Sequence, residues 1–176
     1  HITALIRYLH MVRPTSILDV GLGNGKLGFI ARDFLDVMLG GQFHRSRWQL
    51  QLDGIEAYQD YIQDHQKAIY NKIFIGDAFE VIDQLGRYDM ILMGDVLEHF
   101  EKQRGLEFVD KCFQRAESAI GLFIPLGTGW SQEAIYGNPY ETHLSTWNSD
   151  ELLPISSQHQ IYEYGPGEYG AFLLDK

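Results

Sequence analysis

Residues Ser16–Gly28 read SILDVGLGNGKLG, and this stretch decides the fold. Ile17, Leu18 and Val20 are typical of a buried strand, and three alternating glycines follow before a segment that can be helical. Glycine allows positive φ angles and leaves no Cβ in the way of a ligand, while a helix N-terminus offers free N–H groups. The stretch therefore predicts a strand, a tight turn and a helix start. Both a ligand-binding loop and a glycine-rich connection without a ligand fit this pattern.

The glycines can be grouped in two ways. Gly23, Gly25 and Gly28 spell G-x-G-x-x-G, the dinucleotide fingerprint, which is followed by an acidic residue about 20 positions on. The other grouping starts from Asp19 and takes the glycines at 21, 23 and 25. A carboxylate at the strand end places a fixed negative charge there, which suits a ligand with a cationic portion. We favour this second grouping, in which Gly28 is a helix residue that allows close packing.

Composition limits the class of protein. The chain has 176 residues, 45% of them hydrophobic, which predicts a single domain over residues 1–176. Fourteen Lys and Arg against 24 Asp and Glu give a net charge of −10, which makes nucleic acid an unlikely partner. The basic cluster FHRSRW at residues 43–48 is interpreted as a solvated loop. Cys112 is the only cysteine, so a disulfide framework and a cysteine-built zinc site are excluded within this sequence.

The sequence shows no transmembrane or targeting segment. No run of 18 or more apolar residues occurs, and no charged start followed by an apolar core and a cleavage site is found. With a lone cysteine, these features predict a cytoplasmic protein that does not bind membranes. Because residue 1 is a histidine, we expect the native N-terminus to lie upstream of it.

Periodicity predicts alternating helices and strands. Helices are expected over residues 2–12, 26–39, 58–70, 79–85, 96–118 and 146–153, the last capped by Thr146 or Asn148. Strands are expected over 17–20, 48–57, 72–78, 88–95, 119–126, 160–164 and 169–174, the last two joined by a turn at 165–168. This alternation predicts an α/β fold, a Rossmann-like three-layer sandwich with a mostly parallel seven-stranded sheet. The C-terminal hairpin adds one antiparallel strand.

Acidic residues stand at four predicted strand ends, namely Asp19, Glu56, Asp77 and Asp95. Ligands of open parallel sheets bind at the carboxyl ends of the strands, so these carboxylates are expected to share one site. Taken singly, each would be a helix cap or a solvated carboxylate.

These motifs resemble those of class I S-adenosylmethionine-dependent methyltransferases, and the resemblance covers nearly the whole chain. The acidic residue followed by alternating glycines is similar to the first motif of that family. Glu56 matches its ribose-binding acid, and Asp77 its adenine-facing aspartate. The segment DVLEH, Asp95–His99, is similar to the fourth-strand segment of members that act on small molecules. The implied cofactor-binding residues are Asp19, Gly21, Leu22, Gly23, Asn24, Gly25, Glu56, Ala57, Asp77, Ala78, Gly94 and Asp95.

The resemblance implies a chemistry that suits these residues. One carboxylate, Glu56, can accept from both ribose hydroxyls, and Asp77 can accept from the adenine amine. Asp19 belongs near the cationic sulfonium and amino groups of S-adenosylmethionine. Asp19 and Glu56 are 37 residues apart, farther than the family usually spaces them, and we attribute the excess to a loop inserted around Gly40–Arg47. The implied reaction is an SN2 methyl transfer to an O or N atom, in which alignment dominates.

The acceptor side is less defined. The signature for methylating nucleobase amines, Asn or Asp followed by two prolines and an aromatic residue, is absent, which favours a small-molecule acceptor. His99 and His143 are the candidate catalytic residues; His99 could be a general base or could only pack on the cofactor. With Glu141 they could bind a metal, as in catechol-type methyltransferases, but the acidic cluster of those enzymes is not evident, and we predict no metal.

The stretch at residues 127–146 lacks clean periodicity and is aromatic. Trp130, Tyr136, Tyr140 and the following Trp147 could line a small-molecule pocket or lid, or could fill the edge of the core. Two other functions stay open: a dinucleotide-dependent oxidoreductase, disfavoured because the chain lacks a second nucleotide-binding half and a substrate domain, and a non-catalytic cofactor-binding module that serves a partner. The sequence leaves the acceptor and the oligomeric state undetermined.

Overall fold

The computed structural model describes residues 1–176, and its seven strands form one sheet in the order β3-β2-β1-β4-β5-β7-β6. The strands are β1 (Ser16–Val20), β2 (Gln51–Glu56), β3 (Lys72–Ile75), β4 (Tyr88–Gly94), β5 (Ala116–Leu126), β6 (Gln158–Tyr164) and β7 (Gly167–Asp175). Strands β1 to β5 pair in parallel, and β7 lies antiparallel between β5 and β6. The predicted sheet, with one antiparallel strand from the hairpin, is confirmed.

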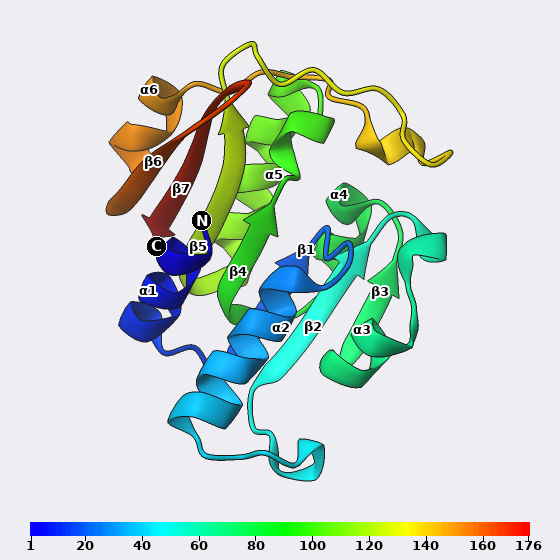
Figure 1. Cartoon of the computed structure of the whole chain (residues 1–176), viewed down its shortest axis with the longest axis vertical. Helices are drawn as coiled ribbons and strands as arrows, with labels where there is room; N and C mark the ends of the chain where they lie inside the picture. The colour runs from blue at the N-terminus through cyan, green and yellow to red at the C-terminus, as the bar shows by residue number, and fades with distance from the viewer.

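Helices cover both faces of the sheet, as Figure 1 shows. They are α1 (Ile2–Val12), α2 (Lys26–Arg32), α3 (Asp64–Ile69), α4 (Ala78–Val81), α5 (Lys102–Arg115) and α6 (Ser149–Leu152). Successive strand residues point to opposite faces, so Ile17 packs in the core under α1 and α2, while Leu18 and Val20 pack in the core under α5. The predicted three-layer sandwich is therefore confirmed. None of the helices combines the length and apolar character that crossing a bilayer requires.

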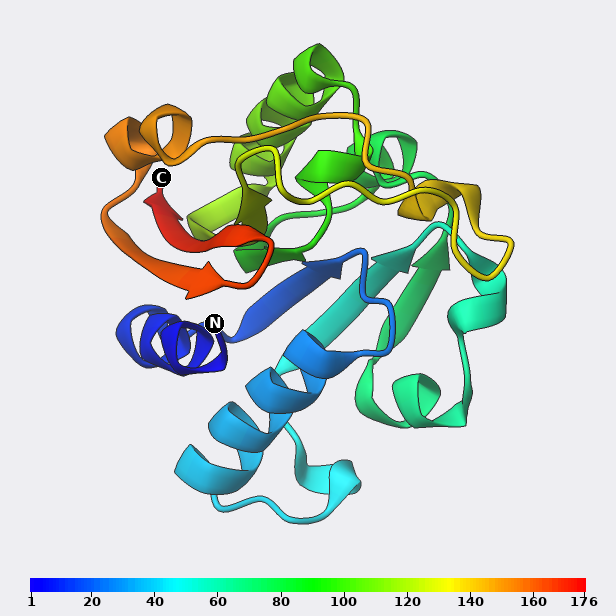
Figure 2. The ribbon, with the colours of Figure 1, turned by 45° about the horizontal axis from the view of Figure 1, so that its top comes forward.

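The parallel strands all deliver their carboxyl ends to one edge of the molecule. In Figure 1 and Figure 2 the arrowheads of β1, β2 and β3 point to the side where the yellow segment after β5 lies. This segment, Gly127–Thr146, contains only a 3-10 turn at Pro139–Glu141 and an isolated bridge between Ile135 and Asn138. It is tied down at its start, where Gly127 donates a hydrogen bond to the carbonyl of Trp147 at 2.8 Å.

The predicted helix over 26–39 changes type along its length. It is an α-helix to Arg32 and a π-helix over Asp33–Leu39. The wider turns direct Asp36 inward, where its carboxylate accepts from the N–H groups of Gln49 and Leu50 at 2.7 and 3.2 Å. Helical periodicity in the sequence does not reveal such a change, because it is imposed by the residues that Asp36 binds.

Two other predicted helices are broken. Residues 58–70 form a 3-10 turn at Gln59–Tyr61 and then α3, because Gln63 is extended and starts a new helix through a capping box with Gln66. Residues 96–118 form a 3-10 turn at Leu97–His99 and then α5, separated by an extended connection. Strand β5 begins at Ala116, which pairs with Tyr88 next to a register shift, so strand pairing takes residues that periodicity assigned to the helix.

The remaining differences lie at element ends. Strands β2 and β3 end at Glu56 and Ile75, earlier than predicted, and Asp77 is the N-cap of α4 rather than the end of a strand. The predicted helix over 79–85 is α4 followed by a 3-10 turn at Ile82–Gln84. Helix α6 is shorter than predicted and is capped by Asn148, one of the two expected caps.

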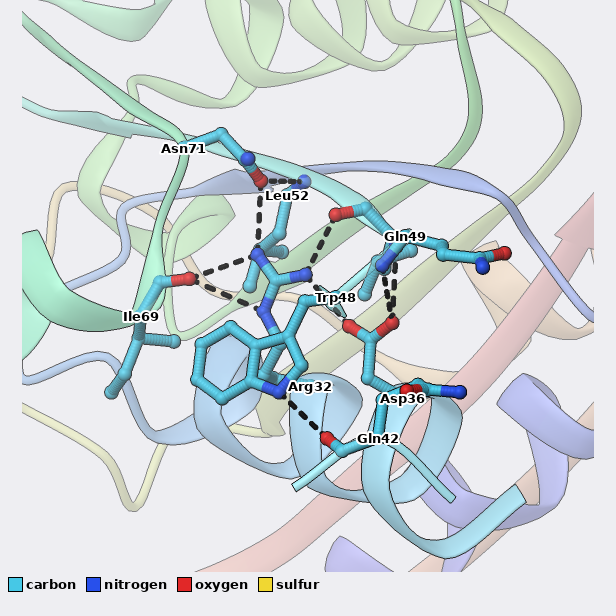
Figure 3. A network of polar contacts seen from close by, with 9 residues as sticks. Arg32, Asp36, Gln42, Trp48, Gln49, Leu52, Ile69 and Asn71 are labelled. Carbon is cyan, nitrogen blue, oxygen red and sulfur yellow. Dashed lines mark hydrogen bonds and ion pairs between the residues drawn. The ribbon is translucent and has the colours of Figure 1, made fainter. Parts of the chain in front are cut away.

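A buried arginine holds the first half of the sheet together. Arg32 is 3% exposed, and Figure 3 shows its guanidinium surrounded by acceptors. It donates to the Asp36 carboxylate at 2.8 Å, to the carbonyls of Leu50 and Ile69 at 2.6 and 2.9 Å, and to the Asn71 side chain at 2.9 Å. These partners come from the helix after β1, from the residue before β2, and from the end of α3 and the connection to β3. The Arg32 side chain therefore links three segments that lie side by side in the fold.

The loop that lengthens the spacing between Asp19 and Glu56 closes on this arginine. The Trp48 indole donates to the carbonyl of Gln42 at 2.9 Å, and the Arg32 guanidinium lies 4.8 Å from the centre of its ring. The predicted insertion is thus a closed loop at the edge opposite the carboxyl ends (Figure 1), and it leaves Glu56 at the end of β2.

Candidate active site

A cavity of about 700 Å³ lies at the carboxyl ends of the parallel strands. Small-molecule sites have volumes of about 300–1,000 Å³. The predicted residues that line it are Asp19, Gly21, Leu22, Gly23, Asn24, Glu56, Ala57, Asp77, Ala78, Gly94, Asp95, His99 and His143. The structure therefore brings the predicted binding residues and both histidines to one cavity. Gly25 is the predicted site residue that does not line it.

The glycine turn leaves its backbone open to the cavity. Gly21 has a φ of +63°, and a Cβ there would lie 2.7 Å from Cγ2 of Val96. Gly23 has a φ of +50°, and a Cβ there would have only the carbonyl oxygen of Gly21 within 4 Å, at 3.9 Å. A ligand can therefore approach the backbone of Gly23 closely, whereas Val96 fills the space beside Gly21.

The other two glycines serve packing. Gly25, with a φ of +81°, is the N-cap of α2 and faces Gln66 and Tyr70. A Cβ at Gly28 would lie 2.2 Å from the hydroxyl oxygen of Tyr70. Gly28 is thus a helix residue that allows close packing, as predicted, and the G-x-G-x-x-G grouping does not describe this cavity.

Glu56 ends β2 with its carboxylate at the wall of the cavity. Its Oε2 accepts from the N–H of Gly23 at 2.9 Å, and its Oε1 accepts from the N–H of Tyr58 at 2.9 Å. The residue is 6% exposed, and burial raises the pKa of its carboxyl group. Glu56 therefore links the glycine turn to the end of β2 and presents acceptor oxygens to donors in the cavity.

Asp19 is buried deeper than its predicted role implies. Its Oδ2 accepts from the hydroxyl of Tyr70 at 2.5 Å and from the N–H of Gly28 at 3.1 Å. Burial raises the pKa of Asp19 to about 7. The expected fixed negative charge is therefore wrong at neutral pH, where the protonated and ionised forms coexist. A cation in the cavity would favour the ionised form.

Asp77 uses both carboxylate oxygens within the protein. Oδ1 accepts from the N–H of Phe79 at 2.9 Å and caps α4, and Oδ2 accepts from the Arg104 guanidinium at 2.9 Å. The pair is partly exposed, with 41% of the Arg104 side chain and 36% of the Asp77 side chain accessible. Its predicted contact with an adenine amine would share an oxygen with one of these donors.

Asp95 lies directly after β4 and carries a left-handed backbone, with a φ of +56°. Its N–H donates to the carbonyl of Phe123 at 3.0 Å, and its Oδ1 accepts from the Tyr169 hydroxyl at 2.8 Å. Burial raises the pKa of Asp95, and burial together with this carboxylate raises the pKa of Tyr169. The C-terminal hairpin thus holds the acid at the end of the central strand.

The two histidines face each other on the β4 and β5 side of the cavity. Their ring centroids are 5.0 Å apart at an interplanar angle of 70°. The Nδ1 atoms contact backbone carbonyls, His99 that of Thr142 at 3.1 Å and His143 that of Trp130 at 2.7 Å. Burial lowers the pKa of His99.

Several of the residues that line the cavity were not predicted from the sequence. They are Lys26, Tyr61, Glu98, Arg104, Gln132, Asn138 and Tyr169. Tyr61 donates to Glu141 at 2.9 Å, which joins the connection after β2 to the segment after β5. Glu98 stands inside the DVLEH segment and could have been noted there, whereas Tyr169 and Gln132 carry no local signal and depend on the tertiary fold.

The aromatic residues after β5 divide between both predicted roles. Trp130 and Tyr140 line the cavity. Trp147 is 1% exposed and belongs to the core, and Tyr136 is 88% exposed and projects away from both. The pocket-lining interpretation therefore holds for Trp130 and Tyr140, and the core interpretation holds for Trp147.

Comparison with known proteins gives similarity of structure without similarity of sequence. No protein-family model matches the chain, and no curated protein matches its sequence. Magnesium protoporphyrin IX methyltransferase from Synechocystis with bound SAH (S-adenosylhomocysteine) is similar at a TM-score of 0.68 and 12% identity, covering 99% of this chain and 81% of that one. TehB from Haemophilus influenzae gives a TM-score of 0.69 at 12% identity, covering 99% and 62%. A SAM-dependent methyltransferase from Archaeoglobus fulgidus gives 0.59 at 15% identity, covering 100% and 95%.

The chain has the class I methyltransferase fold. At these identities the similarity shows the fold alone. The methyltransferase fold places the predicted acidic residues of β1 to β4 around one cavity, in agreement with the sequence resemblance. Because β2 and β3 lie on one side of β1 in the sheet and β4 and β5 on the other, the site residues that follow these strands fall into two groups. Glu56 and Asp77 lie over β2 and β3, and the histidines lie over β4 and β5.

Proposed function

We propose that this chain is an S-adenosylmethionine-dependent methyltransferase that transfers a methyl group to an O or N atom of a small-molecule acceptor. The observation that carries the proposal is Glu56, a buried carboxylate at the end of β2 that is fixed by Gly23 and lines the cavity. Its oxygens are suited to two adjacent hydroxyls of a ribose. The solved methyltransferase from Synechocystis, whose name gives a small-molecule substrate, supports the choice of acceptor class.

The residues of the cavity fit this cofactor. The open space beside Gly23 leaves room for the methionine part, and Asp19 lines the same cavity as an acceptor that ionises beside a cation. Asp77 and Ala78 at the start of α4 bound the place for the adenine. Bound S-adenosylmethionine supplies a methyl group on a sulfonium, which reacts by displacement.

The remaining residues of the cavity serve the acceptor. His99 and His143 stand across the cavity from the predicted nucleoside half, with Asp95 between the two halves at the end of the central strand. The segment Gly127–Thr146 contributes Trp130, Gln132 and Tyr140, which close the cavity and exclude water from the acceptor. These residues align the acceptor atom with the methyl group, which is the main source of rate in such a reaction.

Ligand binding and turnover test this function separately. We expect S-adenosylmethionine and S-adenosylhomocysteine to raise the unfolding temperature and NADH to leave it unchanged. Stabilisation by NADH alone would favour the dinucleotide-dependent oxidoreductase and overturn the proposal. Release of S-adenosylhomocysteine with a panel of hydroxyl and amine acceptors then distinguishes an enzyme from a non-catalytic binding module.

A further inference from the structure

Three potential metal ligands meet on the acceptor side of the cavity. Glu98 and His99 come from the 3-10 turn after β4, and His143 comes from the segment after β5. One ligand atom from each lies within 4.8 Å of the other two. The sequence grouped Glu141 with the histidines, but the Glu141 carboxylate is held by Tyr61 and Gln132 at 2.9 and 3.0 Å. The acidic residue that lies near both histidines is Glu98 rather than Glu141.

Both histidines are oriented as metal ligands are. A backbone carbonyl can only accept a hydrogen bond, so Nδ1 of His99 and Nδ1 of His143 each carry the hydrogen in their contacts with Thr142 and Trp130. The neutral tautomer of either ring with a hydrogen on Nδ1 has its lone pair on Nε2. Histidines that bind metals commonly donate their other N–H to a carbonyl or carboxylate in this way.

Glu98 is a buried carboxyl group without a counter-charge. It is 2% exposed, and its Oε2 has no hydrogen-bond partner. None of the ion pairs of the protein includes it. Its burial follows from the segment after β5, because Leu144 and Ser145 donate to its backbone carbonyl at 2.8 and 3.1 Å. An unpartnered carboxylate oxygen in such a place costs free energy, and a bound cation would remove that cost.

We propose that Glu98, His99 and His143 bind one divalent transition-metal ion. Two imidazole nitrogens and one carboxylate oxygen form a donor set suited to zinc, iron, manganese or cobalt. Metal bonds to these atoms are about 2.0–2.2 Å long, so the side chains draw together when the ion binds. A set of three protein ligands leaves coordination positions open, as in catalytic metal sites.

The open coordination positions of the metal also indicate the chemical class of the methyl acceptor. This step rests on the proposed methyltransferase function. All three ligands belong to the wall of the cavity over β4 and β5, so the open positions face its interior. Hard and borderline divalent ions prefer oxygen there, and coordination lowers the pKa of a hydroxyl group. The acceptor is therefore a molecule that presents a hydroxyl, or two adjacent oxygens, to the metal, and the methylated atom is an oxygen.

Cobalt binding to chelator-treated protein tests the metal site directly. We expect one Co²⁺ per chain by calorimetry, together with visible absorption bands typical of bound cobalt. Glu98→Gln and His143→Gln are each expected to weaken binding by at least about tenfold. His159→Gln, a change of an exposed histidine on β6, is the matched control and should bind as the wild type does. Circular dichroism establishes that each variant is folded, and the wild-type titration stands even where a variant is not.

Absence of saturable cobalt binding to the wild type, or equal affinity in all variants, would overturn the metal site. S-adenosylhomocysteine affinity is measured on the same metal-free protein. Cofactor binding without metal binding overturns only the metal site, and metal binding without cofactor binding overturns only the proposed function. Acetohydroxamate, which offers two adjacent oxygens, is expected to shift the cobalt spectrum, and an unchanged spectrum would overturn the assignment of the acceptor.

Discussion

Burial raises the pKa values of Asp19, Glu56 and Asp95, the carboxyl groups that end β1, β2 and β4 or follow them directly. Each accepts hydrogen bonds from the protein, but none forms an ion pair. In the unfolded chain, water stabilises these carboxylates by hydrogen bonding. A ligand that carries a cation or hydroxyl donors would provide the same stabilisation in the folded protein. At the scale of single residues, the cavity therefore selects for cationic and hydrogen-bond-donating ligands.

Asp19 should make stability depend on pH. Its pKa is about 7 in the folded chain against 3.8 in the unfolded chain. Between these values the folded state keeps a proton that the unfolded state has released, so the free energy of unfolding falls as pH rises. The fall contributed by Asp19 is about 4 kcal/mol over this window. We expect Asp19→Asn to remove it, measured as urea unfolding from pH 4 to pH 7.5.

The control for that experiment is Asp33→Asn, a change of an exposed carboxylate on the π-helix. Its pH profile should run parallel to that of the wild type. A parallel profile for Asp19→Asn as well would show that the pKa of Asp19 is the same in the folded and the unfolded chain.

Glu56→Gln should weaken cofactor binding. The change removes the charge that strengthens hydrogen bonds from ribose hydroxyls, an effect of about 1.5–3 kcal/mol. The dissociation constant of S-adenosylhomocysteine in calorimetry should therefore rise about tenfold to a hundredfold. Glu117→Gln, at an exposed ion pair with Arg87 outside the cavity, should leave it unchanged. An unchanged constant for Glu56→Gln would remove Glu56 from the cofactor site.

The carboxylates of the site could be predicted because each follows a strand that periodicity identifies. Glu98 could not, although it stands next to His99, because its burial comes from the backbone of Leu144 and Ser145 folding over it. The fixed charge expected of Asp19 failed because burial raises its pKa. The hydrogen bond from the Tyr70 hydroxyl, which reaches Asp19 from the end of α3, lowers the pKa but does not offset burial.

At the scale of elements, the strands were easier to predict than the helices. Strands β1, β4 and β5 are buried on both faces, and their continuous apolar runs mark them in the sequence. The π-helix at Asp33–Leu39 and the turn at Leu97–His99 have ordinary helical periodicity in the sequence. Their actual conformations depend on contacts with residues far away in the sequence. Element type followed from local pattern, whereas element ends followed from contacts such as those of Asp36.

Arg32→Lys should destabilise the fold although it keeps the charge. A lysine offers one ammonium group in place of a planar guanidinium that donates to four residues of three segments. Leaving Asp36 and these carbonyls without donors in the interior costs roughly 3–5 kcal/mol. Denaturant unfolding measures the loss. Arg87→Lys, in a half-exposed pair with Glu117, should change stability by less than about 1 kcal/mol, and an equal effect of the two changes would contradict the structural role given to Arg32.

At the scale of the whole molecule, a rigid sheet carries a covering segment with little regular structure. Strands β1 to β5 hold the carboxylates, while Gly127–Thr146 supplies Trp130, Gln132 and His143 from one side. The sequence predicted that sheet and its carboxyl-end site from alternation alone. It could not predict how the covering segment folds, because that segment has no period and is held by contacts such as His143 to Trp130.

Cofactor binding should protect the covering segment from proteolysis. Tyr136 is 88% exposed within it, and Phe43 is 81% exposed in the loop at the opposite edge of the sheet. With S-adenosylhomocysteine bound, chymotrypsin cleavage after Tyr136 should slow several-fold, because the segment must open to enter the protease. Cleavage after Phe43 is the internal control and should keep its rate in mass spectrometry. Equal protection at both sites would indicate global stabilisation rather than closure of this segment.

The hydrogen bond from Tyr169 to Asp95 has a consequence for synthesis of the chain. These residues are 74 positions apart, and β7, which carries Tyr169, inserts beside β5 only after β6 has been made. While the chain is still on the ribosome, the parallel half of the sheet can form with Asp95 lacking its donor. The hydrogen bond that holds Asp95 at the wall of the cavity therefore forms only after β7 has been synthesised.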